Sequence, residues 1–421
     1  MKKETARNEK QTANLQLVKE TNKTLVFNLI YGYGPLSRAE IAKMTRLSPT
    51  TVSSLVAELL EEDVIIETGM GTSATSGRKP ILLEINPNGG YVVSFEMLED
   101  GFKCYLYDLL CNEKAGVKIK AKDYADIEKD MFAAMERIFC RKCINEKKLF
   151  GICISIPALF DADSHKIITS TVLPVQEGNE FILRIREKYP ETPLVVENES
   201  NLYAYAEKAF GTSAGTENLV FIDIGAGIGA GIILDGKMFT GAGNMAGEIG
   251  HMTIDINGTR CKCGNRGCLE VMASVPAITQ RIIFGIMSGR DTIVRDLAGN
   301  DLNRIDMEIV GKAFAEGDPY IVEVIDEIAA RLAAGINNII NVLNPRVIVI
   351  GGEITKLGDL FLDMVRAKIS MIALKPGLDK VELRYSSVKG NMVTMGGARY
   401  VLDKLFMANG FPAAQSQIMF G

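Results

Sequence analysis

The 421-residue sequence has little that would place it in a membrane or outside the cell. No apolar run approaches the roughly 20 residues that a helix needs to cross a bilayer. The first residues, Met1 to Arg7, are polar and lack the apolar segment of a secretory signal. No long low-complexity tract is present, and 47% of the residues are hydrophobic and 24% charged. We therefore expect a globular, cytoplasmic protein of two or three domains that does not bind membranes.

Disulfide bonds are also not expected, because eight cysteines in a cytoplasmic chain indicate free thiols or metal ligands. Cys104, Cys111 and Cys153 stand among apolar residues, which predicts positions in the core. Cys140 and Cys143 have the spacing of half a metal site, but neither a second pair nor a histidine lies near them in the sequence. We interpret this pair as incidental.

An acidic balance argues against nucleic-acid binding, and the net charge of the whole chain is −5. The distribution of charge changes this conclusion. Residues 1–50 contain nine Lys or Arg and four Glu, a surplus of five positive charges, so the other residues together carry −10. A basic segment ahead of an acidic body fits a DNA-binding domain attached to a body that does not touch DNA. A basic disordered tail would explain residues 1–20 equally well, but not the patterned segment that follows.

That segment has the pattern of three short helices. Apolar residues at helical spacing predict the first helix over residues 22–31. Ser37 and Glu40 have the spacing of a capping box at the start of the second helix. Ser48 is placed to cap a third helix, which has Pro49 at its first position. Two helices joined by a tight turn, the second beginning with small polar residues, predict a helix-turn-helix.

Two apolar stretches follow, residues 64–68 and 81–85, and predict the strands of a wing. Residues 1–88 are therefore expected to form a winged helix-turn-helix that binds a double-stranded DNA operator. The expected contacts are hydroxyl groups near the start of the third helix, two arginines close to it and two cations of the wing loop. They are Arg38, Arg46, Ser48, Thr50, Thr51, Ser53, Ser54, Arg78 and Lys79. The alternative is a small helical domain that binds another protein.

From about residue 90 onward, strand and helix patterns alternate, which predicts an α/β body. Nearly continuous apolar runs at residues 149–156 and 219–224 predict buried strands, and residues 320–342 predict a long helix that packs within the body or across a dimer. Glycines alternate through residues 225–231. Such a run lets backbone N–H groups approach a phosphate or a sugar, although glycine-rich hairpins also form for packing reasons.

One histidine and three cysteines lie within eighteen residues of each other, at His251, Cys261, Cys263 and Cys268. Their donor atoms match the preference of Zn²⁺ for tetrahedral nitrogen and sulfur ligands. Because four protein ligands leave no open position, we expect a structural site; the alternative is a cluster of free cysteines. The ion would hold a loop so that Glu248 and Glu270 face a common pocket.

The glycine-rich run, Glu248-x-x-His251 and the segment from Cys261 to Glu270 together resemble the signature of the ROK family of sugar kinases and repressors. The resemblance covers essentially the whole chain, because the repressors of this family carry a winged helix-turn-helix in front. It implies an α/β fold with the two-lobed, actin-like ATPase architecture of sugar kinases and the sugar between the lobes. We accordingly expect a small lobe at residues 89–200 and a large lobe at residues 201–421, the latter with the zinc site and a dimerisation surface.

By the same resemblance, sugar hydroxyls would be held by carboxylates, an amide and a histidine, namely Asn198, Glu199, Glu248, His251 and Glu270. His251 would bind zinc through one ring nitrogen and the sugar through the other. The pair Asn198-Glu199 resembles that of the xylose-type repressors of the family, which favours a pentose as inducer. Glucose, N-acetylglucosamine and other sugars or sugar phosphates are the alternatives.

Several departures from the kinases of the family predict that kinase activity is lost. The kinases have an Asp-x-Gly-Gly-Thr phosphate loop after the first strand of the body, whereas residues 94–99 read Ser-Phe-Glu-Met-Leu-Glu. Their catalytic base is an Asp; the extra methylene of Glu199 displaces the carboxylate by about 1 Å, enough to cost roughly 100-fold in rate. Ala226 replaces a Thr of the second phosphate loop. Separately, residues 155–158 read Ser-Ile-Pro-Ala where the kinases have a Gly-x-Pro-Gly segment that lines the sugar pocket, a change that would narrow this pocket.

These observations together predict a sugar-responsive transcriptional repressor that is not an enzyme. We expect a homodimer or a dimer of dimers in which sugar binding lowers the affinity for a palindromic operator. The first alternative is an ATP-dependent sugar kinase that retains a DNA-binding domain. The second is a sugar-sensing protein whose head binds another protein.

Overall fold

The computed structural model describes residues 2–70, 80–121, 127–161, 166–170, 173, 180–212, 214–408 and 418–420. The chain divides into two compact units. The first consists of Met1–Ala158, Asp163–Glu197 and Gly397–Gly421, and the second of Leu159–Ala162 and Asn198–Gly396. The C-terminal segment from Gly397 onward thus belongs to the first unit, whereas the sequence analysis had placed it in the large lobe.

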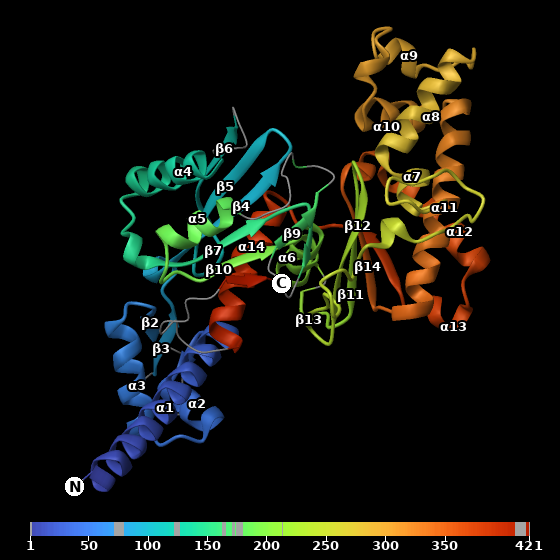
Figure 1. Ribbon diagram of the computed structural model, residues 1–421. Coiled ribbons are helices and arrows are strands. Elements are labelled where there is room, and N and C mark those ends of the chain that lie inside the picture. The colour runs from blue at the N-terminus through green and yellow to red at the C-terminus, as the bar shows by residue number, and fades with distance from the viewer. Residues whose placement is uncertain are drawn as a thin grey trace. The chain divides into compact units, whose positions relative to one another are not determined.

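The first unit begins with a winged helix-turn-helix, which is the fold expected for residues 1–88 (Figure 1). Its elements are α1 (Lys2–Tyr33), β1 (Leu36–Ser37), α2 (Arg38–Thr45), α3 (Pro49–Glu61), β2 (Ile65–Met70) and β3 (Ile81–Ile85). The three strands form an antiparallel sheet in the order β1-β3-β2. Helix α1 is longer than residues 22–31, because its polar first part contains neither glycine nor proline and consists largely of residues that tolerate a helix.

Local sequence signals set the boundaries of α2 and α3. The Ser37 hydroxyl accepts a hydrogen bond from the Glu40 N–H at 3.3 Å, and the Glu40 carboxylate accepts one from the Ser37 N–H at 2.8 Å. The predicted capping box is therefore confirmed. The Ser48 hydroxyl accepts from the Thr51 N–H at 3.1 Å, and Pro49 follows as the first helical residue. The second helix of the motif therefore begins where the sequence predicts.

The body of the first unit is a six-stranded sheet in the order β16-β10-β7-β4-β5-β6. An antiparallel meander of β4 (Tyr91–Leu98), β5 (Gly101–Asp108) and β6 (Glu113–Lys120) is extended by the parallel strands β7 (Leu149–Ser155), β10 (Leu194–Glu197) and β16 (Ile418–Phe420). The first unit also contains η1 (Pro87–Gly89), α4 (Ile127–Lys142), η3 (Glu146–Lys148), β9 (Lys166–Thr169) and α5 (Glu180–Lys188), whereas β8 (Leu159–Asp161) belongs to the second unit. The pairing of β16 with β10 explains why the C-terminal segment belongs to this unit.

The second unit contains a five-stranded sheet in the order β13-β12-β11-β14-β15. An antiparallel meander of β11 (Leu219–Ile224), β12 (Ile228–Leu234) and β13 (Lys237–Met238) is again extended by parallel strands, β14 (Val347–Gly351) and β15 (Glu382–Tyr385). In both units the first strand of the meander is central and pairs with the next parallel strand. This repeated strand order agrees with the expected actin-like fold of two α/β lobes.

Within the part of the chain that the structure describes, most helices lie in the second unit. They are α6 (Glu199–Phe210), η4 (Ile249–His251), α7 (Leu269–Ala273), α8 (Val275–Met287), α9 (Val294–Leu297), η5 (Leu302–Arg304), α10 (Met307–Ala315), α11 (Pro319–Leu343), η6 (Glu353–Leu357), α12 (Gly358–Ile372) and α13 (Lys375–Leu378). Helix α14 (Met392–Asp403) begins in this unit and ends in the first. The long α11 is the predicted helix of residues 320–342, and its apolar face is buried in the core of this unit. Among the described residues, none of the helices combines the length and the apolar character needed to cross a membrane.

Helix α11 also holds the short helix α7 in place. A Cβ atom on Gly335 would approach the Leu269 side chain to 2.7 Å, so the two helices are in close contact there. The Arg331 guanidinium donates a hydrogen bond to the Met272 carbonyl oxygen at 3.0 Å. Because α7 directly follows Cys268 and contains Glu270, this contact positions two of the predicted site residues.

Candidate functional site

The N-terminal end of α3 presents small hydroxyl side chains to solvent. Thr50, Ser53 and Ser54 are exposed and Thr51 is half-buried. The exposed Ser48 hydroxyl lies 2.7 Å from that of Thr50 and 2.8 Å from that of Thr51. The group therefore caps the helix and also offers donors and acceptors of the kind that contact base edges and phosphates.

The cationic side chains expected at the DNA differ in their surroundings. Arg46 is exposed and occupies the turn between α2 and α3 in a left-handed conformation, with φ of 60°. Arg38 is instead bonded to Glu67 of β2, with 2.7 Å between Nη2 and Oε1. A DNA phosphate would have to compete with this carboxylate, which the sequence analysis did not identify. Arg78 and Lys79 lie outside the described residues.

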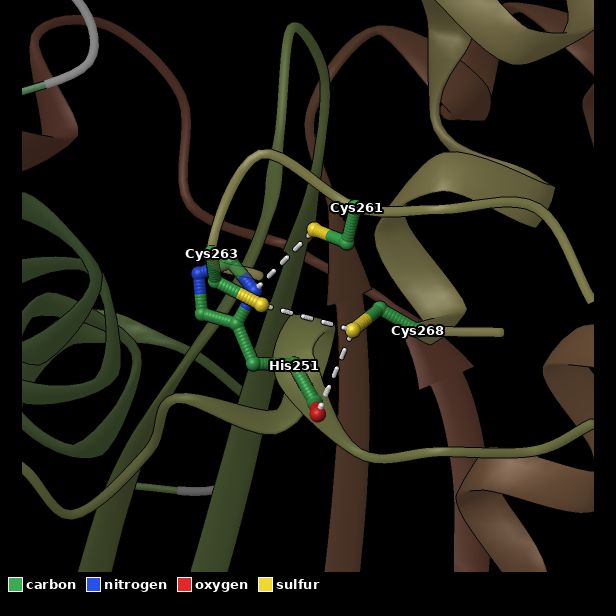
Figure 2. Close-up of side chains that lie close together, drawn as sticks. All are labelled: His251, Cys261, Cys263 and Cys268. Carbon is green, nitrogen blue, oxygen red and sulfur yellow. Dashed lines mark hydrogen bonds between the residues drawn. The ribbon is translucent and has the colours of Figure 1, made fainter. Parts of the chain in front are cut away.

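The predicted metal ligands converge from separate positions in the chain (Figure 2). His251 ends η4, Cys261 and Cys263 lie in the loop that follows, and Cys268 immediately precedes α7. Bridges between Thr253 and Cys268 and between Arg260 and Arg266 fold this loop back on itself. The histidine ring and the three sulfur atoms thereby point toward a common centre.

The geometry of this cluster fits a tetrahedral metal ion. The four donor atoms lie within 4.8 Å of one another. The sulfur atoms of Cys263 and Cys268 are 3.7 Å apart, and the Cys261 sulfur lies 3.8 Å from Nδ1 of His251. Tetrahedral coordination with Zn–S bonds of about 2.3 Å requires sulfur atoms about 3.8 Å apart. The cluster is therefore compatible with a structural metal, and Nδ1 is the ring nitrogen that faces the cysteines.

Two carboxylates flank the cluster, as expected. Glu248 immediately precedes η4, and Glu270 lies in α7. Burial raises the pKa of Glu248; the His251 charge lowers it and the like charge of Glu270 raises it. The effect of Glu270 indicates that the two carboxylates lie near each other. The Ile228 N–H donates to the Glu270 carboxylate at 3.4 Å, which holds that side chain at the start of β12.

Asn198 and Glu199 lie in the same unit, at the start of α6. The Asn198 side chain accepts a hydrogen bond from the Ser200 N–H at 2.9 Å and so caps the helix, and Glu199 is its first residue. Helix α6 packs against β12, where a Cβ atom on Gly229 would come within 2.5 Å of the Ser200 hydroxyl. This glycine therefore serves helix packing, which is one of the two interpretations that the sequence allowed for the glycine run.

Strand β12 also contacts the segment that carries Glu248. The Ala230 N–H donates to the Gly247 carbonyl oxygen at 2.9 Å. Strand β12 thus contacts α6. Its Ala230 donates a hydrogen bond to Gly247, the residue before Glu248, and its first residue, Ile228, donates one to Glu270. The predicted sugar-binding side chains consequently project from segments that all contact β12 or bond to it.

The segment that the sequence predicts to lack the kinase phosphate loop, residues 94–99, lies in a β-hairpin. Strands β4 and β5 pair Leu98 with Gly101, so only Glu99 and Asp100 form the turn. Glu96 lies opposite Lys103, and its buried carboxylate accepts hydrogen bonds from the lysine Nζ at 2.8 and 3.0 Å. Lys103 is not among the residues predicted from the sequence, although a two-residue turn between the two strands would place it opposite Glu96.

Comparisons with known proteins agree with both parts of this architecture. The model of the ROK family matches residues 112–404, and the model of the winged helix-turn-helix DNA-binding family matches residues 21–66. The putative xylose repressor of Caldicellulosiruptor sp. is 30% identical over 398 residues, which are 93% of this chain and 98% of the relative. The N-acetylglucosamine repressor of Escherichia coli is 30% identical over 367 residues, which are 87% of this chain and 88% of the relative.

Solved structures show the same fold. The crystal structure of a ROK family transcriptional regulator, a homologue of the E. coli MLC protein, has a TM-score of 0.80 and 29% identity, and covers 92% of this chain and 97% of its own. The ROK hexokinase of Thermus thermophilus has a TM-score of 0.62 and 21% identity, and covers 76% and 100%, so it shares the fold of the body. The chain therefore belongs to the ROK family, in the branch that carries a winged helix-turn-helix ahead of the sugar-kinase-like body.

Proposed function

We propose that this chain is a transcriptional repressor whose affinity for its operator is lowered by a monosaccharide or a sugar phosphate. The observation that carries the proposal is the presence, in one chain, of a winged helix-turn-helix and a ROK body. The head supplies a helix with an exposed, hydroxyl-rich N-terminal end. The similarity to xylose and N-acetylglucosamine repressors supports the same function.

The body is proposed to have lost kinase chemistry. In the β4–β5 hairpin, the carboxylates of Glu96, Glu99 and Asp100 stand near the place where a phosphate would need positive or neutral donors. The Lys103 ammonium is already paired with Glu96. Glu199 in place of a catalytic Asp would also misplace a proton acceptor. A sensor needs none of these functions, because only differential binding is required to shift its affinity for DNA.

The His/Cys cluster is proposed to hold one structural Zn²⁺. Three cysteines and a histidine are a donor set that Zn²⁺ prefers, and their separations suit tetrahedral coordination. When bound, the ion would fix η4 relative to α7. Glu248, which precedes η4, and Glu270, which lies in α7, would then keep a constant separation for ligand binding.

The sugar is proposed to bind to Asn198, Glu199, Glu248, His251 and Glu270. Carboxylate oxygens accept hydrogen bonds from adjacent hydroxyl groups, which is the common feature of sugar-binding sites built from acidic residues. His251 would use Nε2 for the sugar, because its Nδ1 faces the cysteines. The Asn198-Glu199 pair favours a pentose such as xylose over the other candidates.

We further propose that the protein acts as a homodimer or a dimer of dimers on a palindromic operator. Each copy would place the N-terminal end of α3 in the major groove. The contacts there would come from Ser48, Thr50, Thr51, Ser53 and Ser54, with Arg38 and Arg46 at the phosphates. Arg78 and Lys79 of the wing loop would reach the minor groove.

A thermal unfolding series tests the sensor part of this proposal. The protein is unfolded with D-xylose, D-glucose, N-acetylglucosamine and their phosphates, each with and without ATP–Mg. A ligand that binds only the folded state stabilises it by about 2.7 kcal/mol at a hundredfold excess over Kd. We expect Tm to rise with one sugar and not with ATP–Mg. A rise with ATP–Mg would instead favour the sugar-kinase function.

The DNA part is tested separately by fluorescence anisotropy. The chain has no tryptophan, so the fluorophore is placed on the DNA duplex, which the protein first selects from a random library. We expect nanomolar binding that weakens when the stabilising sugar is added. Sequence-specific binding that no sugar alters would leave a DNA-binding protein without an inducer, and an absence of binding would contradict the repressor function.

A further inference from the structure

The last described helix packs against the DNA-binding head on one side and carries a lysine that interacts with the last residue of strand β10 on the other. Helix α14 (Met392–Asp403) continues without a break into a π-helical turn, Lys404–Ala408. The chain passes from the second unit to the first between Gly396 and Gly397 of this helix. Single π-helical turns are uncommon and often occur at functional sites. We call Lys404–Ala408 the coupling turn.

One face of this helix and of the coupling turn packs against α1 of the head. Phe406 is fully buried, with its ring centroid 4.5 Å from that of Phe27 and 5.4 Å from that of Tyr31. The Tyr31 hydroxyl donates a hydrogen bond to the Asp403 carboxylate at 3.2 Å. The Arg399 guanidinium lies 4.9 Å from the centroid of the Tyr31 ring and is bonded to Asp403 at 2.9 Å. Any displacement of the coupling turn therefore acts directly on α1.

The opposite face carries Lys404, whose charge interacts with that of Glu197, the last residue of strand β10. Lys404 Nζ lies 4.6 Å from the centroid of the Tyr400 ring, one helical turn earlier. Burial lowers the pKa of Lys404, and the charge of Glu197 raises it, so the ammonium and the carboxylate interact. Glu197 is only 3% exposed, and its charge also contributes to the raised pKa of Tyr400, of which burial is the main cause. Lys404 thus shares a largely buried environment with the last residue of β10.

Glu197 lies next in the chain to the residues proposed to bind the sugar. Glu197 is followed directly by Asn198 and Glu199, the residues proposed to bind the sugar at the start of α6. A change in the backbone at these two residues on sugar binding would act on Glu197, their covalent neighbour. Lys404 and Phe406 are two residues apart, so they point to nearly opposite sides of one helical turn. The coupling turn therefore interacts with Glu197, the residue before the sugar-binding pair, on one side and packs against α1 of the head on the other.

We propose that the coupling turn transmits the sugar-bound state to the DNA-binding head, through Glu197 and Lys404 on one side and Phe406, Tyr31 and Phe27 on the other. This inference rests on the proposed sensor function. It assigns to Lys404 and Phe406 a positioning role, with no contact to sugar or DNA. Replacing either residue should leave sugar binding and operator binding intact but remove the effect of one on the other.

The test compares two affinities in each variant. Operator binding is measured by anisotropy with and without saturating D-xylose, or with D-glucose or N-acetylglucosamine if one of these gives the Tm shift. Sugar binding is measured by calorimetry. Allosteric proteins typically link two sites by a factor of about 5 to 150. In Lys404→Met and Phe406→Leu we expect both separate affinities to stay within about threefold of wild type while that factor falls to nearly 1.

Matched control variants carry the same two substitutions at positions outside the coupling turn. Lys142→Met changes an exposed lysine of α4, and Phe361→Leu changes a fully buried phenylalanine of α12 in the second unit. Both controls should keep the wild-type factor. If Lys404→Met and Phe406→Leu do not fold, Tyr31→Phe decides the matter, because it removes only the hydroxyl that bonds to Asp403.

A reduced factor in Tyr31→Phe supports the proposal, and an unchanged factor overturns it. If the Lys404→Met and Phe406→Leu proteins fold and sugar still changes their operator affinity by the wild-type factor, the proposed role of the coupling turn is wrong. The sensor function is unaffected by that result. A wild-type operator affinity that responds to no sugar overturns the sensor function, and the coupling turn with it.

Discussion

At the scale of single residues, the cysteines occupy distinct environments. Cys111 is buried, and burial raises the pKa of its thiol to about 12, so it remains protonated and unreactive. Cys140 and Cys143 are exposed, and no described metal-ligating group gathers around them. Cys268, by contrast, is buried beside the other members of the His/Cys cluster. Convergence with His251, and not burial, separates the candidate metal ligands from the other thiols, because Cys263 is exposed while Cys111 is buried.

We predict that Cys268→Ser removes the metal, because three remaining ligands cannot complete tetrahedral coordination. Zinc content measured by mass spectrometry should fall from about one ion per chain toward zero after dialysis. Tm should fall as well, since metal binding contributes to folding free energy. Cys140→Ser is the matched control and should keep both zinc and Tm. Equal zinc content in the two variants would show that the cluster is not the metal site.

At the scale of elements, the capping box of α2 ties the turn of the DNA-binding motif to the helix. The Ser37 backbone N–H and then its hydroxyl lower the pKa of Glu40 below its ordinary value of 4.5. Because the pKa of Glu40 is lower in the folded than in the unfolded protein, its contribution to the free energy of unfolding is fully present above pH 4.5. It is lost as the pH falls through the lowered value.

We predict that Ser37→Ala destabilises α2 by about 1 kcal/mol, because an N-terminal N–H loses its acceptor. Amide hydrogen exchange in Arg38–Thr45 should then become about fivefold faster, which is the population change that 1 kcal/mol produces. The difference between wild type and variant should shrink as the pH falls below 4.5 and Glu40 takes up a proton. Ser53→Ala, an exposed serine of α3 outside the cap, should leave exchange in α2 unchanged.

At the scale of the whole molecule, the two proposed binding functions lie in different compact units. The candidate DNA contacts are all in the first unit, and the candidate sugar contacts are all within Asn198–Gly396 of the second. Loss of one binding function therefore need not abolish the other. The surplus of positive charge lies in residues 1–50, at the start of the first unit.

We predict that Glu270→Gln abolishes the rise in Tm caused by sugar but preserves operator binding without sugar. The substitution removes a charged acceptor of sugar hydroxyls, worth about 1.5 to 3 kcal/mol for a charged hydrogen bond, or roughly 10- to 100-fold in Kd. Its protein should remain bound to the operator at sugar concentrations that release the wild type. Glu316→Gln changes an exposed glutamate of the same unit and should behave like wild type. Loss of operator binding in sugar-free Glu270→Gln would contradict this separation.

Local features of the fold were predictable because their causes are local. The caps at Ser37 and Ser48 and the apolar strands each depend on residues a few positions apart, and the structure confirms them. The His/Cys cluster is also encoded within a short segment, so its convergence followed from spacing and donor chemistry. Helix α1 was predicted too short, because a polar helix leaves no periodic apolar pattern to detect.

The sequence by itself determined the class of each lobe, the helix-turn-helix and the candidate metal site. Only the tertiary structure decided that Gly397–Gly421 joins the first unit, through the pairing of β16 with β10. It also decided that Tyr31 meets Asp403, which is 372 residues away, and that Arg38 is paired with Glu67. Such contacts depend on how whole helices and strands pack. Packing brings together side chains that are far apart in the sequence and share no local periodicity, cap or motif.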